Sequence, residues 1–444
     1  MGSNLFRKVM GTDYEHGIVV LCDQAIVSLT NFATAVIVGR ACGKTELGAY
    51  TLAWSVITIV SGISSRLTST PYMVYGPQLS RSQRSSYLTS VCLHQLLCST
   101  VSASFIAIGV LLLSSNRVIS GDIEKIMMTT AAVIVSITLR EFIRSISFAD
   151  MTPRWALCVD LVASLGQMTG IVLLLKHGTL AAFHVLMMLG ISSAVAVVLW
   201  ASCHKTVLRL EWTRCFRDLR VSWKLGKWVL GSGLLWQLAN YLYPWMIAAF
   251  HGTSVTGVWA ACCGVVAIGN PIWMGLGNYL LPRVSSVYAI SGVTAMRRYV
   301  RRSSILLAVS LLPFVIMLTV YGERSVERIY GGAYSGTGVI VAILALNLVV
   351  ASLATPYAQA LFTLENASAD TLSNVVGVSV LFAMGILAVR SHAAVGAAAT
   401  MLASSSIGVV IRMGAFARST HRHMTSTSGL TGAHTRIAIT ASNP

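Results

Sequence analysis

Charged residues are scarce in this chain of 444 residues, and that scarcity sets its class. Asp, Glu, Lys and Arg together make up 11% of the sequence, against about 25% in an average soluble domain. Hydrophobic residues make up 55%, and the mean hydropathy is +0.73. These values exclude a soluble globular protein and predict a polytopic membrane protein.

Apolar stretches long enough to cross a bilayer recur along the chain, since a helix needs about 20 residues to span the hydrocarbon core. Runs of this length exclude a transmembrane β-barrel, whose strands are about ten residues of alternating pattern. We therefore predict an all-α integral membrane protein with about twelve transmembrane helices. Their expected ranges are 18–39, 47–65, 87–113, 123–146, 156–175, 180–200, 225–250, 254–281, 303–321, 337–363, 371–389 and 394–412.

Acidic residues are fewer than basic ones, with 15 Asp and Glu against 32 Lys and Arg. If both termini and alternate loops share one side of the membrane, that side holds 24 of the 32 basic residues. Because basic residues gather on the cytoplasmic side, we predict a multi-pass protein of the cytoplasmic (inner) membrane with both termini in the cytoplasm. The net charge of +17 follows mostly from this bias, so no nucleic-acid partner is expected.

Metal-binding and catalytic patterns are missing. The nine cysteines form no CxxC pair, and none joins histidines at metal-ligand spacing. We therefore expect no metal site and no cofactor. The loops on the predicted outer side are short, the longest being 322–336, and leave no room for a catalytic domain. The chain is therefore predicted not to be an enzyme.

The stretch 202–224 carries six basic residues and divides the predicted helices into six and six. At an offset of 209 residues, Asn31 aligns with Asn240 and Gly48 with Gly257. This predicts two pseudo-symmetric six-helix lobes around a central cavity, related by an axis along the membrane normal. The predicted parts are a cytoplasmic N-terminus (1–17), an N-lobe (18–201), an inter-lobe loop (202–224), a C-lobe (225–412) and a disordered basic tail (413–444).

Several predicted helices have one polar side. At 100° per residue, the strongly polar residues of "LCDQAIVSLTNFATAVIVGR" (21–40) fall within an arc of about 160°. A carboxylate at this depth costs several kcal/mol unless it faces protein or water. "LGSGLLWQLANYLYPW" (230–245) and "GNPIWMGLGNYLLPR" (269–283) also concentrate polar residues. Such faces line a hydrated cavity between lobes, or else form hydrogen bonds that hold a bundle together. The cavity candidates are Asp23, Gln24, Asn31, Trp236, Gln237, Asn240, Tyr243, Asn270, Trp273 and Asn278.

Four stretches resemble the polysaccharide flippases of the multidrug/oligosaccharidyl-lipid/polysaccharide exporter superfamily. "DQAIVSLTNFATAVIVGRACGKTELGAYTLAWS" (23–55) is similar to the first two helices of that family. "IRSISFADMTPRWALCVDL" (143–161) is similar to its fourth-to-fifth-helix loop. "IYGGAYSGTGVIVAILAL" (329–346) and "ATPYAQALFTLENAS" (354–368) are similar to the start and end of its tenth helix. Each match is weak alone, and their order along the chain strengthens the resemblance.

The resemblance implies a flippase that moves a polyprenyl-diphosphate-linked oligosaccharide across the membrane by alternating access, for assembly of a surface polysaccharide. The polyprenyl tail would stay in lipid while the head group passes through the cavity. A hydrated path is needed because polar groups lose their water in hydrocarbon. Arginine suits a diphosphate through its planar donor fork. Arginines at helix ends are candidates for this contact or are ordinary positive-inside anchors: Arg40, Arg66, Arg140, Arg144 and Arg283.

Asp23 has three interpretations. Some antiporters of the same superfamily carry an acidic residue in the first helix that binds a proton or a sodium ion. By this resemblance Asp23 is the ion-coupling candidate, with H⁺ or Na⁺ as the partner. Alternatively, it is an ordinary hydrogen-bonded residue or contacts sugar hydroxyls.

Three other functions stay open at this point. One is a peptidoglycan-precursor flippase, although that family usually has fourteen helices. A cation-coupled drug or metabolite antiporter of the same superfamily would need an acidic cavity, whereas the candidates here are mostly amides and aromatics. A polytopic polysaccharide polymerase or glycosyltransferase would need sizeable outer loops. The expected partners are therefore a lipid-linked oligosaccharide and membrane lipids.

Overall fold

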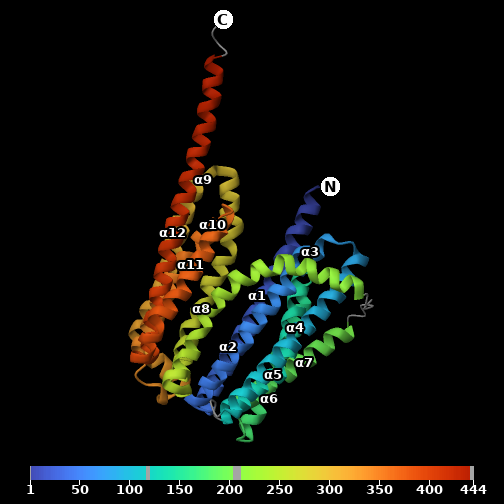
Figure 1. Ribbon diagram of the computed structural model, residues 1–444, viewed down its shortest axis with the longest axis vertical. Coiled ribbons are helices and arrows are strands. Elements are labelled where there is room, and N and C mark those ends of the chain that lie inside the picture. Colours follow the sequence, from blue (N-terminus) through green and yellow to red (C-terminus); the bar gives the residue numbers. More distant parts are fainter. Residues whose placement is uncertain (1, 117–120, 204–211, 441–444) are drawn as a thin grey trace. The chain divides into compact units, whose positions relative to one another are not determined.

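The computed structural model describes residues 2–116, 121–203 and 212–440. Side chains in these ranges are described except at 2–16, 81–82, 212–213, 224–225, 228–229, 232, 271–279, 281–282, 367 and 423–440. Helices and short turns make up the described chain, so the predicted all-α class is confirmed (Figure 1). The elements are α1 (Gly2–Ala41), α2 (Lys44–Leu67), α3 (Ser69–Tyr75), η1 (Gly76–Gln78), α4 (Arg81–Ser115), α5 (Gly121–Ala149), α6 (Pro153–Lys176), α7 (Ala182–Cys203), α8 (Trp212–Val266), η2 (Ala267–Gly269), α9 (Asn270–Tyr330), η3 (Gly332–Tyr334), α10 (Gly338–Thr363), α11 (Ala367–Val380), η4 (Leu381–Gly385) and α12 (Ile386–Thr440).

Within the described residues, ten helical segments are long and apolar enough to cross a membrane. Two of them each hold two predicted helices, because the backbone breaks at a residue with positive φ: Gly252 (φ 82°) in α8 and Ala393 (φ 49°) in α12. Glycine reaches this backbone region at little cost, whereas alanine pays a steric penalty there. Counted at these breaks, the ten segments overlap all twelve predicted spans, although Gly233–Gly269 begins inside the seventh span (225–250) and ends inside the eighth (254–281).

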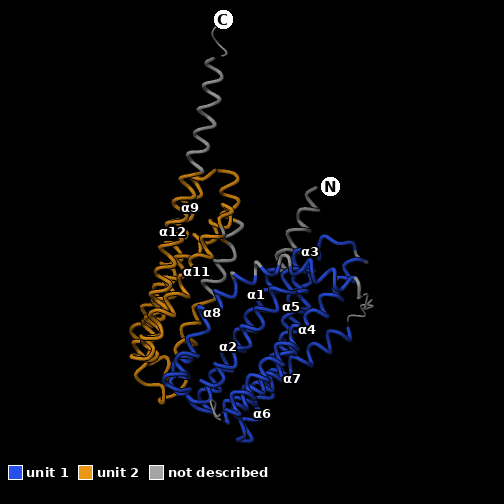
Figure 2. The backbone as a smooth tube through the Cα atoms, in the orientation of Figure 1, with its two compact units in different colours: residues 1–261 blue, residues 262–444 orange. Residues whose placement is uncertain are grey.

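The chain divides into two compact units, residues 1–261 and 262–444 (Figure 2). In unit 1, α5 is the most buried of the candidate spans and packs against α2, α4, α6 and α7. Its buried residues are mostly apolar, and Ile134, Ile137 and Phe142 are almost inaccessible. α5 is therefore the element on which the other helices of unit 1 assemble. The predicted division into lobes 18–201 and 225–412 stays a prediction.

Unit 2 is built on α10, which packs against α9 and α12. Phe416 of α12 is buried there and meets the Tyr357 ring edge-on at 5.6 Å between centroids. Asn366 Nδ2 also donates to Ser419 Oγ at 2.8 Å. Residues 413–420 are thus a packed continuation of α12, and this part differs from the predicted disordered tail. One aromatic side chain and a few small residues are enough to pack this segment within unit 2, because it continues a long helix that already fixes its position.

A close helix crossing in unit 1 involves the two glycines that the internal alignment pairs. A Cβ on Gly48 of α2 would lie 1.8 Å from the carbonyl oxygen of Thr253 in α8. Reciprocally, a Cβ on Gly257 would lie 1.9 Å from the carbonyl oxygen of Lys44. Lys44 and Thr253 are also 209 residues apart, so the contact is self-complementary, as expected where a two-fold pseudo-symmetry axis passes. The two close contacts are therefore related by the same 209-residue offset, while the pseudo-symmetry of the lobes stays a prediction.

Replacing Gly48 with Ala should destabilise the protein, because the new methyl group meets backbone atoms that cannot rotate away. Overpacking of this kind costs about 1–3 kcal/mol, which outweighs the helix-propensity gain of about 1 kcal/mol. The measurement is the thermal unfolding midpoint in detergent. Gly109→Ala is the control, since no atom lies within 4 Å of its Cβ position. An equal midpoint for the two variants would show that the crossing is loose.

Candidate functional site

A cluster of five charged side chains lies inside unit 1. α5 supplies Arg140, Glu141 and Arg144, and the four-residue spacing places both arginines on one face of the helix. Asp23 comes from α1 and Asp160 from α6. Both aspartates are fully buried. Charges at this depth are costly and persist where they pair with one another or serve a function.

Arg144 is the centre of this cluster. Its Nη2 donates to Asp23 Oδ2 at 2.8 Å, and its Nε lies 2.9 Å from Asp160 Oδ2. Nη2 also donates to Gln24 Oε1 at 3.1 Å, and Nη1 lies 3.6 Å from Glu141 Oε2. One guanidinium thus connects α1, α5 and α6. The planar fork of arginine makes such shared contacts possible, and a lysine would not reproduce them.

Negative charge exceeds positive charge in the cluster. Three carboxylates face two guanidiniums, since Arg140 pairs with Glu141 (Nη2 to Oε1, 3.0 Å) and approaches Asp160 (Nε to Oδ1, 3.7 Å). Asp23 Oδ1 and both oxygens of Asp160 have no hydrogen-bond partner, because the Asp160 ion pairs lack hydrogen-bond geometry. With every group ionised, the cluster carries one net negative charge. Binding one monovalent cation would therefore neutralise it.

A polar pocket of about 230 Å³ lies beside the cluster in unit 1. Its wall consists mainly of hydroxyl and amide side chains. The lining residues are Thr58, Ser61, Gly62, Ser64, Ser65, Ser69, Gln95, Thr138, Glu141, Phe142, Ser145 and Gln237.

Three of the lining residues each have a buried side-chain oxygen without a hydrogen-bond partner: Ser61 Oγ, Ser64 Oγ and Gln237 Oε1. Many other serine and threonine hydroxyls of the bundle donate to carbonyls in their own helix, as Thr130 does to Ile126 at 2.8 Å. Buried polar atoms without partners are costly unless water or a ligand satisfies them. The pocket is therefore equipped to bind water or a hydrogen-bonding ligand.

Glu141 belongs to both features. Its side chain lines the pocket and also pairs with Arg140 and Arg144. Neither Glu141 nor Asp160 was among the candidates from the sequence. The usable signal was the Arg140-Glu141-x-x-Arg144 pattern inside an apolar stretch, since such charges require buried partners.

The predicted residues of α1 and α5 are brought together in part. Asp23 and Gln24 meet Arg144, and Arg140 lies in the same cluster. Both arginines are paired with carboxylates in this structure. Asn31 is half-buried, and α1 supplies no lining residue of the pocket.

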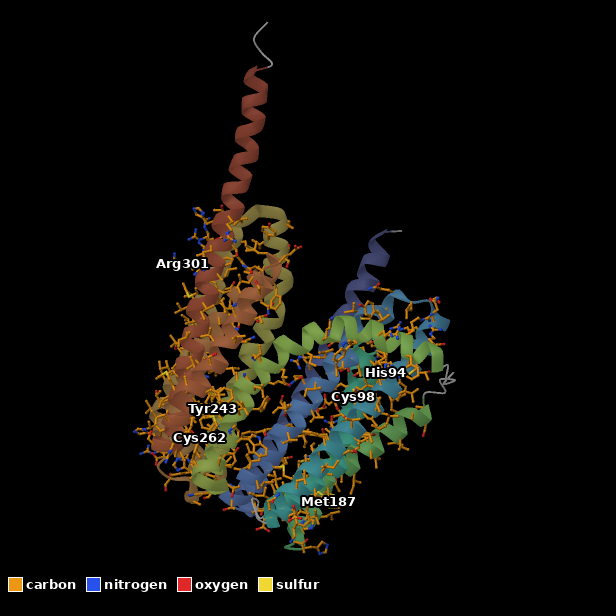
Figure 3. All side chains as sticks on the ribbon, in the orientation of Figure 1. His94, Cys98, Met187, Tyr243, Cys262 and Arg301 are labelled. Atoms are coloured by element: carbon orange, nitrogen blue, oxygen red, sulfur yellow. The ribbon has the colours of Figure 1, made fainter. Side chains whose placement is uncertain are left out.

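The predicted residues of α8 lie on different sides of that helix. Gln237 lines the pocket and its Nε2 donates to the Thr58 carbonyl at 3.0 Å. Trp236 is exposed, and half-buried Asn240 donates to the Trp236 carbonyl in its own helix. Tyr243, which Figure 3 labels on α8, is buried. Its ring centroid lies 6.0 Å from that of Trp259.

Three of the remaining predicted residues are not among those that line the pocket. Asn270 is half-buried at the start of α9, Arg40 is exposed at the end of α1, and Arg283 is exposed on α9. The side chains of Trp273 and Asn278 lie outside the described residues.

Arg66 lies next to the pocket. Its Nη1 donates to the carbonyl of Gly62, a lining residue, at 2.9 Å. Its side chain also packs over Gly233 of α8, where a Cβ would clash with the guanidinium. None of the described carboxylates forms an ion pair with Arg66.

Replacing Arg144 with Gln should strongly destabilise the protein, because it leaves Asp23 and Asp160 buried without their shared cation. Removing one partner of a buried ion pair costs about 3–5 kcal/mol. The measurement is the unfolding midpoint in detergent, with exposed Arg324→Gln as the control. The double variant Asp23→Asn with Arg144→Gln should lose less than Arg144→Gln alone. Independent, additive losses would contradict the shared role of Arg144.

No protein-family model matches the chain, and no curated protein matches its sequence. Solved structures do match its fold. An inward-facing multidrug resistance MATE family transporter of the MOP superfamily aligns with a TM-score of 0.73 and 13% identity, covering 89% of this chain and 94% of that one. MOP abbreviates the multidrug/oligosaccharidyl-lipid/polysaccharide superfamily named above.

Two further structures agree in fold. The lipid II flippase MurJ, in an inward closed conformation, gives a TM-score of 0.72 at 13% identity over 93% of this chain and 91% of that one. A MOP superfamily transporter from Pyrococcus furiosus gives 0.62 at 12% identity over 91% and 94%. The chain therefore has the fold of MOP superfamily transporters, which include both multidrug transporters and a lipid flippase.

Proposed function

We propose that this protein is a multi-pass transporter of the cytoplasmic membrane that flips a polyprenyl-diphosphate-linked oligosaccharide from the cytoplasmic to the outer leaflet. The observation that carries the proposal is the polar pocket of unit 1, with its unpaired Ser61, Ser64 and Gln237 atoms. Hydroxyls and amides both donate and accept hydrogen bonds, as sugar hydroxyls do. The resemblance to MurJ in fold is consistent with a lipid-linked substrate.

The charge of the pocket favours a sugar over a cationic drug. Its carboxylate, Glu141, is paired with Arg140 and Arg144, and the two other carboxylates of the cluster do not line the pocket. The other residues that line the pocket are neutral. A cation-coupled drug antiporter of the same fold, like the MATE neighbours, is the second candidate, and the excess carboxylate of the cluster is what supports it.

The pocket is too small for a whole oligosaccharide. Sites for small molecules usually enclose about 300–1,000 Å³, whereas this one encloses about 230 Å³. We infer that it holds one part of the glycan at a time, as a subsite along the transport path. The polyprenyl tail remains outside, where the exposed faces of the helices are apolar.

Arg66 is the strongest of the predicted diphosphate contacts. Unlike Arg140 and Arg144, it has no carboxylate partner among the described residues, and it lies one helical turn from the pocket residue Gly62. A guanidinium beside a sugar subsite suits the diphosphate that joins glycan to lipid. Asp23, in turn, is the proposed ion-coupling residue, with H⁺ or Na⁺ neutralising the excess carboxylate of the cluster.

Glu141 would connect substrate and ion binding. A sugar hydroxyl that donates to Glu141 competes with Arg140 and Arg144 for its oxygens, so pocket occupancy changes how Arg144 is shared. Arg144 holds Asp23 and Asp160, and therefore α1 and α6. This chain of contacts is the physical route by which the two events would be coupled.

Deleting the gene should cause a lipid-linked oligosaccharide to accumulate in the cytoplasmic leaflet. In proteoliposomes, the purified protein should move a fluorescent lipid-linked oligosaccharide between leaflets, measured by chemical quenching of the outer leaflet. Drug sensitivity of the deletion strain without such accumulation would favour the antiporter.

Ser61→Ala should raise the substrate concentration for half-maximal flipping by about two- to tenfold, because one hydrogen bond is worth about 0.5–1.5 kcal/mol. Alanine is a good helix former, so the fold should be retained. Ser379→Ala is the matched control, since Ser379 is exposed on α11 and donates only to its own helix. Equal effects of the two variants on flipping would show that the pocket does not bind the transported substrate.

Asp23→Asn should abolish the dependence of flipping on the ion gradient, because the amide cannot exchange a charge while it can still accept from Arg144. The measurement is the initial flipping rate in proteoliposomes with imposed pH or sodium gradients. Gln24→Glu is the comparison, since Gln24 contacts the same guanidinium. A gradient response as large as wild type would exclude Asp23 as the coupling residue.

A further inference from the structure

Four arginines of α9 form an exposed basic surface on unit 2, which we call the arginine face: Arg297, Arg298, Arg301 and Arg302. At 100° per residue they lie within an arc of 140°, so they share one side of the helix. No described acidic side chain forms an ion pair with any of them. Figure 3 shows the labelled Arg301 at the outer edge of unit 2. Four positive charges therefore lie together without a carboxylate partner in the part of the chain that the structure describes.

The same side of α9 continues as an exposed apolar strip. Ile305, Val309, Leu312, Ile316 and Val320 fall within the arc of the arginines and are 51%, 52%, 42%, 59% and 65% exposed. This strip covers the 16 residues from Ile305 to Val320, or about 22 Å at a rise of 1.5 Å for each of the 15 steps between them. That length corresponds to much of the roughly 30 Å hydrocarbon core. A surface with charge at one end and an apolar strip beyond it matches the shape of a phospholipid.

We propose that this surface binds an anionic phospholipid of the surrounding bilayer. The phosphate lies on the arginine face, and an acyl chain lies along Ile305, Val309 and Ile316. The four residues form two i,i+4 pairs, Arg297 with Arg301 and Arg298 with Arg302, so the surface can hold two phosphates side by side. Arginine binds phosphate through two parallel hydrogen bonds. A lipid with two phosphates, such as cardiolipin, should therefore bind best.

The proposal does not depend on the transported substrate. Anionic lipids give the cytoplasmic leaflet a negative surface potential, and each nearby basic residue contributes about a fivefold gain in binding. The predicted topology places 297–302 on the cytoplasmic side. The structure thus assigns a lipid site to a segment that the substrate pocket of unit 1 does not include.

The experiment is native mass spectrometry of the purified full chain with added cardiolipin, phosphatidylglycerol, phosphatidylcholine or a polyprenyl diphosphate. Cardiolipin should bind most tightly and phosphatidylcholine least. Arg298→Gln with Arg302→Gln should weaken cardiolipin binding by about 25-fold. The control is Arg324→Gln with Arg390→Gln, which removes the same charge from exposed arginines of α9 and α12 and should change binding less than twofold.

Three results would overturn the proposal. Equal losses in the two double variants would show that net charge alone matters. Equal binding of phosphatidylcholine would show that the arginines do not select a headgroup. If the polyprenyl diphosphate displaced cardiolipin when present at a lower concentration than the cardiolipin, the surface would be a substrate site instead. Because flipping is not the readout, failure here is distinguishable from failure of the proposed transport function.

Discussion

The sharing of Arg144 among buried carboxylates is the interaction on which unit 1 most depends. It joins α1, α5 and α6 through contacts of 2.8 to 2.9 Å with Asp23 and Asp160. In a membrane the hydrophobic effect does little to hold helices together, so polar contacts and close packing must do so. Since any partner left alone would be a buried charge, the three helices are held in one arrangement. The ion pairs offset the free-energy cost of burying these charges only while every partner is present.

The cluster and the pocket together suggest why the charges are kept. A purely structural bundle could replace such a network with apolar residues at little loss or with a gain in stability. Here the excess carboxylate and the position of Glu141 on both features give the network a use. A group that both contacts the pocket and shares the arginine can respond to what the pocket holds. Under the proposed transport function, such a response would accompany movement of the substrate.

Close packing complements these polar contacts at the Gly48–Gly257 crossing. There the helices approach until only hydrogen atoms fit between their backbones, and the reciprocal contacts follow the 209-residue offset. Elsewhere the outer faces are apolar, and at Arg297–Arg302 they are basic as well, so lipid is the natural neighbour. Internal and external surfaces thus follow one rule, namely that each polar group needs a partner of matching chemistry.

The sequence by itself determined the class, the helices and the charge of the loops. Apolar stretches of about 20 residues must become helices in a bilayer, because each satisfies its own backbone hydrogen bonds. It also marked Asp23 as a residue that needs a partner. The tertiary structure alone decided that the partner is Arg144, that Glu141 and Asp160 join it, and that Gln237 rather than α1 lines the pocket. Periodicity gives the side of a helix on which a residue lies, whereas its neighbour depends on how helices distant in sequence pack.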